Sequence, residues 1–361
     1  MTKAGKTAVA LFFILVIIGL IMLSSAGVVE GQKKFNSASY YPIHQLTSGI
    51  IPGLIIFLIF SKISYERWKR WSLPILLLAI ALLLAVFVPG LGRGVNGAQR
   101  WLDFKIAIVQ PSEFLKFALI LYCAAWFSSR LREKGERSVV SLIPFLLVLG
   151  AAAALLVLQP DFGTLGIVII IGLAMFFFSG ATFKHFFVLI LVMLVLLGGL
   201  AVAAPYRFNR IKTFLNPHED KQNTSYHINQ ALISIGSGGV WGLGYGQSKQ
   251  KLGALPEPVG DSIFAVIVEE MGLVGGLALT GLFTIYLFAL LQIARQTSDS
   301  FGRLVVLGIA VWIGGQALIN IAAISGIIPL TGVPLPLISF GSSSLVSLMG
   351  AMGIIKNISC A

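Results

Sequence analysis

The chain alternates between long apolar runs and short polar connections. A helix that crosses the hydrocarbon core of a bilayer needs about 20 mainly apolar residues. Ten runs have roughly this length: 8–28, 44–61, 73–90, 111–128, 139–158, 163–180, 185–204, 263–293, 303–326 and 336–356. The pattern predicts an all-α integral membrane protein with about ten transmembrane helices, folded as one polytopic membrane domain over residues 1–361.

The amino-acid composition also indicates a protein that is embedded in lipid. Hydrophobic residues make up 57% of the chain and charged residues only 11%, whereas soluble domains carry about 25% charged residues. Two cysteines support neither a disulfide framework nor a metal cluster. A net charge of +12 would suggest nucleic acid in a soluble protein. Here cytoplasmic loops rich in Lys and Arg explain it, and no nucleic-acid partner is expected.

Basic residues also predict the orientation, because Lys and Arg concentrate in short cytoplasmic loops. If the N-terminus is inside, the inner connections hold Lys62, Arg67, Lys69, Arg70, Arg130, Arg132, Lys134, Arg137, Lys184, Arg295, Arg303 and Lys356. The short outer connections hold only Lys33, Lys34, Arg93, Arg100 and Lys105. Both termini are therefore predicted to be cytoplasmic.

The same orientation places the long polar segment 205–262 outside, between spans seven and eight. Its basic residues are Arg207, Arg210, Lys212, Lys221, Lys249 and Lys251. Long loops are exempt from the charge rule. The segment is either a solvated loop or a surface that meets an anionic lipid or phosphate.

Ionisable groups within or beside a span are costly and are candidates for function. Glu113 and Lys116 share one helix face at the start of the fourth span, either as an internal ion pair or facing a polar cavity. Glu269 and Glu270 lie within the eighth span and need a polar partner, such as Lys116 or an arginine.

Two aspartates stand where helices begin. Asp161 follows Gln-Pro in a tight turn and suits a turn or a helix cap. Asp261 closes the long outer segment, four residues after Glu257. It is either an N-cap or a general base at the membrane surface.

Two further segments carry candidate contacts. Trp101 suits an interfacial anchor and Arg100 beside it could hold a phosphate. Residues 326–344 are apolar but broken by Pro and Gly, and they contain Ser342 and Ser343. Irregular backbone at membrane depth must be buried in protein or line a wet cavity, so a re-entrant or loop segment near the outer site is predicted.

The residues show no dedicated metal or nucleotide motif. The histidines at 44, 185, 218 and 227 lack ligand spacing, and no phosphate loop or nucleophile elbow is present. A divalent cation, Mg²⁺ or Mn²⁺, would be held by oxygen ligands such as Glu113 or Asp261. No nucleotide or organic cofactor is expected.

Several motifs, in order along nearly the whole chain, resemble the SEDS family (shape, elongation, division and sporulation), which includes FtsW and RodA. They are Asn-Gly-Ala-Gln-Arg-Trp-Leu at 96–102, Gln-Pro-Ser-Glu-Phe-Leu-Lys at 110–116, Gln-Pro-Asp-Phe-Gly-Thr at 159–164, Ile-Gly-Ser-Gly-Gly-Val-Trp-Gly-Leu-Gly at 235–244, Gly-Gln-Ser-Lys-Gln-Lys-Leu at 246–252, Leu-Pro-Glu at 255–257 with Asp261, and Pro-Leu-Pro-Leu-Ile-Ser-Phe-Gly-Ser-Ser-Ser at 334–344. Gly-Gln-Ser-Lys-Gln-Lys and the closing Asn-Ile-Ser at 357–359 look closer to the division-type member FtsW than to RodA.

One motif departs from the family. The usual Pro-Glu-x-His-Thr-Asp-Phe-Ile-Phe-Ala reads Pro-Glu-Pro-Val-Gly-Asp-Ser-Ile-Phe-Ala at 256–265. Asp261 and its spacing from Glu257 are kept, but the flanking His and Thr are absent. Any helper role of those two neighbours is therefore in doubt here.

The resemblance implies a peptidoglycan glycosyltransferase in the cytoplasmic membrane that polymerises lipid II at the outer face. It implies Asp261 as the general base. Its partners would be lipid II, the nascent lipid-linked glycan, a class B penicillin-binding protein and other divisome membrane proteins. Substrate contacts are expected from Arg100, Trp101, Glu113, Lys116, Asp161, Lys249, Lys251, Glu257, Ser342 and Ser343, with Glu269 and Glu270 in support. A lipid II flippase, an elongation-type polymerase and a structural scaffold are the competing hypotheses.

Overall fold

The computed structural model describes residues 1–95, 98–105, 107–132, 142–202 and 224–360. Its helices are α1 (Lys3–Ala26), α2 (Val28–Phe35), α3 (Tyr40–His44), the π-helix η1 (Gln45–Ile50), α4 (Ile51–Lys62), α5 (Tyr65–Ala85), α6 (Pro111–Arg132), α7 (Ile143–Leu158), α8 (Phe162–Phe178), α9 (Phe183–Val202), α11 (Thr224–Ser237), the 3₁₀ turn η3 (Gln250–Leu252), α12 (Ile263–Gln296), α13 (Ser300–Ile324) and α14 (Ser342–Ile358). The strands are β1 (Gly92–Val95), β2 (Ala98–Asp103) and β3 (Ile108–Val109).

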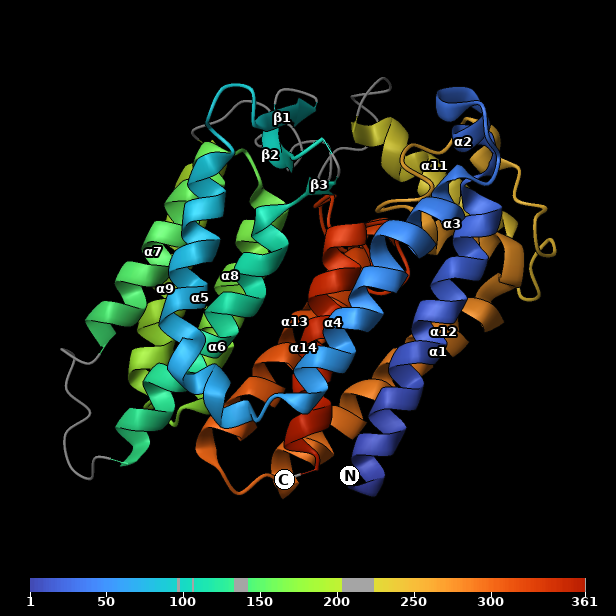
Figure 1. Ribbon diagram of the computed structural model, residues 1–361. Coiled ribbons are helices and arrows are strands. Elements are labelled where there is room, and N and C mark those ends of the chain that lie inside the picture. The colour runs from blue at the N-terminus through green and yellow to red at the C-terminus, as the bar shows by residue number, and fades with distance from the viewer. Residues whose placement is uncertain (96–97, 106, 133–141, 203–223, 361) are drawn as a thin grey trace.

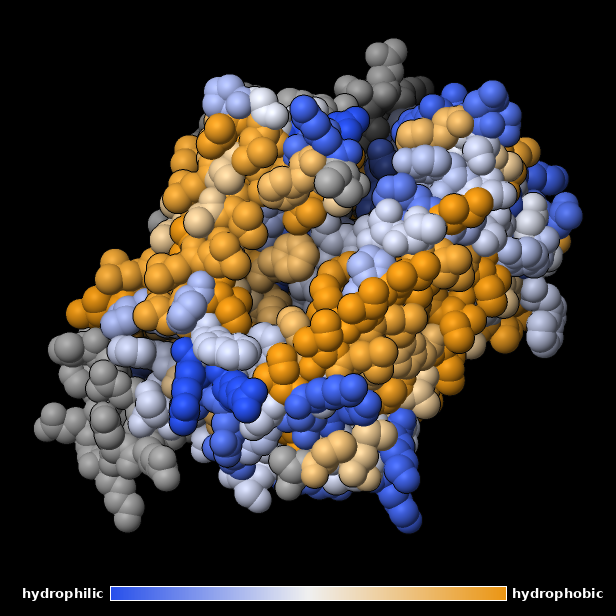
Figure 2. Space-filling model, viewed as in Figure 1, coloured by the Kyte–Doolittle hydropathy of each residue, from blue (hydrophilic) through white to orange (hydrophobic). Residues whose placement is uncertain are grey.

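Each of the ten apolar runs overlaps a helix in the part of the chain that the structure describes, so the prediction of a mostly helical membrane protein is confirmed. Among the described residues, five helical stretches are long and apolar enough to span a bilayer: Lys3–Ala26, Tyr40–Lys62, Tyr65–Ala85, Ile263–Gln296 and Ser300–Ile324. Figure 2 shows an apolar belt across the visible face, with hydrophilic residues gathered at both ends. The count of ten crossings stays a prediction.

The two termini meet at one end of the helical bundle (Figure 1). The Thr2 amide donates to the Ser359 carbonyl at 3.0 Å. Asn357 of α14 also binds the preceding connection between α4 and α5, through the Tyr65 amide at 2.9 Å and the Ser61 carbonyl at 3.1 Å. An even number of crossings would bring both ends to the same face in this way.

The connections are more ordered than the all-α prediction allowed. Between α5 and α6, β1, β2 and β3 form an antiparallel sheet in that order. The strands are two to six residues long, too short to show a clear two-residue periodicity. The segment 205–262 is likewise not a simple polar loop, because α11 packs against α12. Arg207, Arg210, Lys212 and Lys221 lie outside the described residues.

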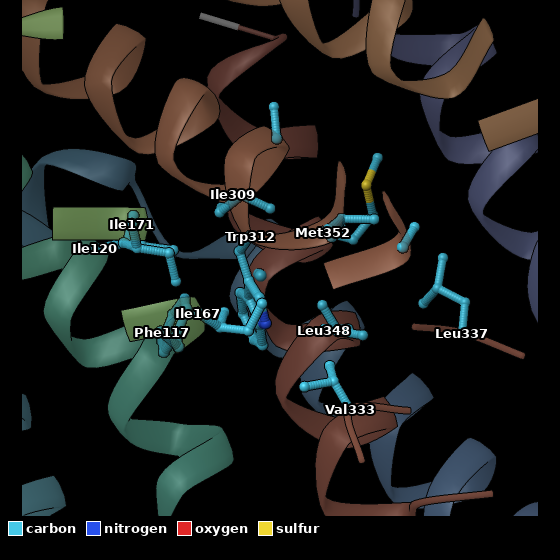
Figure 3. Packing of buried hydrophobic residues seen from close by; sticks show 14 of the residues in the cluster. Phe117, Ile120, Ile167, Ile171, Ile309, Trp312, Val333, Leu337, Leu348 and Met352 are labelled. Carbon is cyan, nitrogen blue, oxygen red and sulfur yellow. The ribbon is translucent and has the colours of Figure 1, made fainter. Parts of the chain in front are cut away.

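Helix α13 is the centre of the packed core. It contacts α6, α8 and α12, and its Trp312 is fully buried. Figure 3 shows Trp312 between Phe117 of α6, Ile167 of α8 and Leu348 of α14. Much of α13 is buried among apolar side chains, so a polar residue on its buried face must find its partner within the protein.

Helix α12 is not one continuous span. Gly272 breaks it with φ 72° and ψ −176°. The turn at residues 239–244 replaces the lost helical hydrogen bonds: Leu273 and Val274 amides donate to the Gly239 and Val240 carbonyls at 2.9 and 3.2 Å, and Leu243 and Gly244 amides donate to the Glu269 and Glu270 carbonyls at 2.9 Å each. The backbone groups exposed at the break are therefore hydrogen-bonded to the turn at residues 239–244.

We expect Gly272→Ala to destabilise the protein by about 2–3 kcal/mol or more. An added Cβ would lie 2.3 Å from the Val240 carbonyl oxygen, at a positive φ that L-residues disfavour. Gly281→Ala is the matched control on the same helix, since its Cβ meets nothing within 4 Å. Thermal unfolding in detergent should show a lower Tm for Gly272→Ala alone. Equal Tm values for the two variants would contradict this account of the break.

Candidate active site

A tight turn holds Asp261 just outside the first turn of α12. The Glu257 carbonyl accepts from the Gly260 and Ser262 amides at 3.1 and 3.2 Å. Glu257 itself has φ 47°, a left-handed conformation that non-glycine residues adopt at a cost and that often marks functional sites. Ser262 occupies the N-cap position. Asp261 therefore lies one residue before the N-cap, so it is not the N-cap residue of α12.

The broken Pro-Gly segment clamps this turn from the other side, as predicted for a loop packed near the site. Ser339 Oγ donates to the Gly260 carbonyl at 2.6 Å and accepts from the Leu335 amide at 2.8 Å. The Phe340 amide donates to the Val259 carbonyl at 2.9 Å. Asn320 Nδ2 of α13 donates to the carbonyls of both Asp261 and Val333, each at 2.8 Å. The backbone that carries Asp261 is thus fixed by two separate elements.

Glu257 and Asp261 place two carboxyl groups on this turn, close enough to interact electrostatically. A methyl group at Gly260 would lie 3.5 Å from Glu257 Oε2, and one at Gly332 would lie 3.9 Å from Asp261 Oδ2. Glu257 is exposed at the protein surface. Even so, loss of water around its carboxyl group, followed by repulsion from Asp261, raises the pKa of Glu257. Paired carboxylates of this kind suit proton transfer or cation binding.

Sequence reasoning missed the side chains that surround this pair. His227 Nε2 of α11 lies 2.6 Å from Ser262 Oγ. Lys34 and Glu30 of α2 are close enough to act electrostatically on Glu257. For Asn320 a signal existed, because Gln316 and Asn320 stand four residues apart in an apolar helix, where amide side chains are costly without partners.

Glu113 and Lys116 form a buried ion pair, with Lys116 Nζ 2.8 Å from Glu113 Oε1. Lys116 Nζ also donates to Gln316 Oε1 at 3.0 Å and lies 5.0 Å from the centre of the Trp312 ring. Gln316 Nε2 in turn donates to the Pro334 carbonyl at 3.0 Å. Glu113 and Lys116 therefore form an internal ion pair and do not face a polar cavity. Gln316 connects this pair to the segment that clamps Asp261.

The residues predicted to contact substrate from the connections between helices bind several different elements of the fold. The Arg100 guanidinium donates to the Pro160 carbonyl, which ties β2 to the turn before Asp161. Asp161 accepts from the Thr164 amide and from Ser112 Oγ, each at 3.4 Å, and caps α8. Trp101 pairs with Arg93 across the two strands.

Two serines at the start of α14 bind neighbouring elements. Ser343 Oγ accepts from the Gln110 amide at 3.0 Å, and Ser342 Oγ lies 3.4 Å from His44 Nδ1. They therefore join α14 to the sheet connection and to α3. Direct substrate contacts by these residues stay predictions.

The expected partners of the adjacent carboxylates in α12 were wrong. Glu270 Oε1 pairs with Lys251 Nζ at 2.6 Å and accepts from Ser25 Oγ of α1 at 2.6 Å. Among the described residues, neither Lys116 nor an arginine is its partner. The segment before α12 folds back on this helix, so Lys251 reaches Glu270 although it lies outside every apolar run.

Glu269 accepts four hydrogen bonds instead of forming an ion pair. Its donors are Ser234 Oγ at 2.7 Å, Ser248 Oγ at 2.6 Å, and the amides of Lys249 and Gln250 at 2.8 and 3.3 Å. Lys249 presents its side chain to solvent, whereas Lys251 is buried. Of these two predicted substrate ligands, only Lys249 is accessible here.

The described residues contain no group of three or more His, Cys, Asp or Glu side chains able to hold a metal ion. Glu113 is a poor candidate ligand because it is buried and the Lys116 ammonium already neutralises its charge through Oε1. The pair of Glu257 and Asp261 fits better with Mg²⁺, which is often held by one or two carboxylates together with substrate phosphates.

This fold and site define a multi-pass membrane protein with a carboxylate site at one end of its bundle. The chain belongs to the FtsW/RodA/SpoVE family of cell cycle proteins, whose model matches residues 6–361. The resemblance to the SEDS family is thereby confirmed.

Individual relatives match over almost their full length. Stage V sporulation protein E of Bacillus subtilis is 36% identical, with 99% of this chain and 97% of the relative covered. A probable peptidoglycan glycosyltransferase FtsW of Methylomonas methanica is also 36% identical, over 98% of this chain and 91% of that protein.

Solved structures agree on the fold. A chain from a peptidoglycan synthase complex that coordinates polymerisation and crosslinking superposes with a TM-score of 0.81, at 25% identity over 98% of this chain and 96% of its own length. The rod-shape-determining protein RodA of Thermus thermophilus gives a TM-score of 0.72, at 25% identity over 98% and 95%.

We expect Lys251→Met to destabilise the protein by about 3–5 kcal/mol, because it leaves the buried Glu270 carboxylate without its counter-ion. Lys34→Met removes a largely exposed partner of Glu30 and should cost less than about 1 kcal/mol. Thermal unfolding of both variants measures the difference. A Lys251→Met variant as stable as wild type would exclude a structural role for this ion pair.

Glu257 should make stability depend on pH. Its pKa is higher in the folded than in the unfolded protein, so folding favours the protonated carboxyl group, and this contribution is lost as pH rises through the folded-state pKa. Glu257→Gln should therefore raise Tm at neutral pH, and the gain should shrink as pH falls towards 4.5. Glu66→Gln, at an exposed carboxylate, controls for the charge change. A gain that grows on acidification would reverse the predicted sign.

Proposed function

We propose that this chain is a peptidoglycan glycosyltransferase that polymerises lipid II into glycan strands at the outer face of the cytoplasmic membrane. The observation that carries this proposal is the carboxylate of Asp261, held on a clamped turn beside Glu257 in a member of this family. Relatives at 34–36% identity bear the name peptidoglycan glycosyltransferase FtsW.

The proposed topology has ten spans and cytoplasmic termini. The contact between Thr2 and Ser359 supports termini on one side, and ten helices lie at the predicted runs. With that orientation, residues 205–262, Asp261 and the β-sheet connection face outside. Both lipid-linked substrates would then reach the site from the outer leaflet without leaving the bilayer.

Asp261 acts as the general base in the proposed reaction. The 4-hydroxyl of one lipid-linked sugar attacks the anomeric carbon of the other, and its proton passes to the Asp261 carboxylate. The bond from that carbon to the pyrophosphate oxygen breaks, and undecaprenyl pyrophosphate leaves with the electron pair. The transition state has oxocarbenium character, as in other glycosyl transfers.

The negative charge that develops on the pyrophosphate needs a cationic environment. Arg100 and Lys249 are candidate ligands with side chains that are not fully buried. A Mg²⁺ or Mn²⁺ ion on Glu257 and Asp261 would supply additional positive charge. Lys116 would not contact the pyrophosphate directly. It would act through Gln316, which connects the buried pair of Lys116 and Glu113 to the clamp segment.

A class B penicillin-binding protein is the proposed partner. Support comes from the structural neighbour, which belongs to a synthase complex that joins polymerisation to crosslinking. The FtsW names of several relatives at 34–36% identity favour a septal role with other divisome proteins over the elongation role of RodA, whose structure is 25% identical.

Asp261→Asn should lower the rate of lipid II polymerisation by about 10²–10⁴-fold, as expected for loss of a general base, without unfolding the protein. Asp299→Asn is the matched control: Asp299 also precedes a helix, caps α13 through the Gly302 amide at 2.9 Å, and can be replaced by another good cap.

The measurement is glycan chain formation from purified lipid II, with and without the penicillin-binding partner. Full polymerisation by folded Asp261→Asn would exclude this assignment of the base. Lipid II scrambling between vesicle leaflets without any polymer would identify a flippase instead.

A further inference from the structure

His227 is a polar residue of α11 that reaches the start of α12. Its Nε2 atom lies 2.6 Å from Ser262 Oγ, and Ser262 is fully buried. Ser262 directly follows Asp261. The contact therefore joins two elements, 35 residues apart in the chain, at the residue next to the proposed base.

The turn around Asp261 has few polar side chains of its own. The family pattern has His and Thr immediately before the aspartate and Phe after it, whereas this chain has Val259, Gly260 and Ser262. Val259 is buried among apolar residues. An imidazole and a hydroxyl are present beside Asp261 nonetheless, because α11 supplies the first and position 262 the second.

The hydrogen bond of His227 completes a three-sided support for the turn. Asn320 of α13 holds the Asp261 carbonyl, and Ser339 of the clamp segment holds the Gly260 carbonyl. His227 holds the side chain of the next residue from α11. Each contact comes from a different element, so three separate parts of the fold hold the turn.

We propose that His227 is a positioning residue for Asp261, acting through the Ser262 hydroxyl. This inference rests on the proposed polymerase function. A general base must lie within about 2.6–3.2 Å of the proton that it removes. A displacement of about 1 Å can cost about 10²-fold in rate, so loss of one support should reduce turnover more than substrate affinity.

The test compares four variants of the full-length protein in complex with its penicillin-binding partner: His227→Leu, Ser262→Ala, the double variant, and His227→Gln. His227→Leu and Ser262→Ala should each lower kcat by about ten- to a hundredfold, with KM for lipid II within about twofold. The double variant should be no slower than the slower single variant, because both changes remove the same hydrogen bond.

His227→Gln should restore kcat to within about threefold of wild type, because its terminal amide can reach the Ser262 hydroxyl in place of Nε2. His185→Leu is the matched control. His185 also contacts a hydroxyl, that of Thr182 near the start of α9, and its loss should leave kcat unchanged. Tm is measured for every variant, so that a rate lost through unfolding is recognised.

Wild-type kcat in His227→Leu or Ser262→Ala would overturn the inference. Multiplying effects in the double variant, or a His227→Gln variant as slow as His227→Leu, would overturn it as well. Asp261→Asn, assayed in parallel, separates this inference from the proposed function. If wild type polymerises and Asp261→Asn does not, failure of the His227 series removes only the positioning role.

Discussion

Polar groups inside an apolar helical bundle must find partners within the protein, and two side-chain amides of α13 supply such partners to several parts of the site. Gln316 binds Lys116 and the Pro334 carbonyl, and Asn320 binds the carbonyls of Val333 and Asp261. One face of a buried helix therefore links the internal ion pair, the irregular clamp segment and the proposed base. Replacement of Gln316 or Asn320 by an apolar residue would remove at least two of these hydrogen bonds at once, and lipid offers no alternative partners.

The same constraint explains the second polar centre, at the break in α12. Glu269 and Glu270 are not substrate ligands in this arrangement. They bind the returning chain at residues 248–251 together with Ser234 of α11 and Ser25 of α1. Because Gly272 opens the helix at this point, the turn at 239–244 can enter and pair with the exposed backbone. Glu269 thus holds α11 against α12 through Ser234, close to where His227 meets Ser262, whereas Glu270 binds α1 and the returning chain.

Much of the candidate site was visible in the order of motifs along the chain. Asp261, Glu257 and the irregular segment 326–344 were each recognised from local sequence, because aspartate before a span, paired carboxylates and Pro-Gly breaks are uncommon in apolar runs. His227, Asn320 and Ser339 were not. Their importance comes from what they contact, and those contacts join residues 35, 59 and 79 positions apart. No local pattern encodes a distance of that kind.

The amino-acid sequence by itself determined the helical membrane architecture, because a bilayer accepts only backbones whose hydrogen bonds close within the segment, and hydrophobic length then reveals the spans. The sequence also indicated which carboxylates lie within or beside apolar runs, where a charged group is costly unless it has a partner or a function. Only the tertiary structure decided how each charge is compensated: Lys251 rather than Lys116 pairs with Glu270, and Lys116 turns inward to Glu113 and Gln316. The physical reason is that a buried charge takes its partner from whichever segment packs against it, and helix packing, unlike helix formation, depends on residues far apart in the chain.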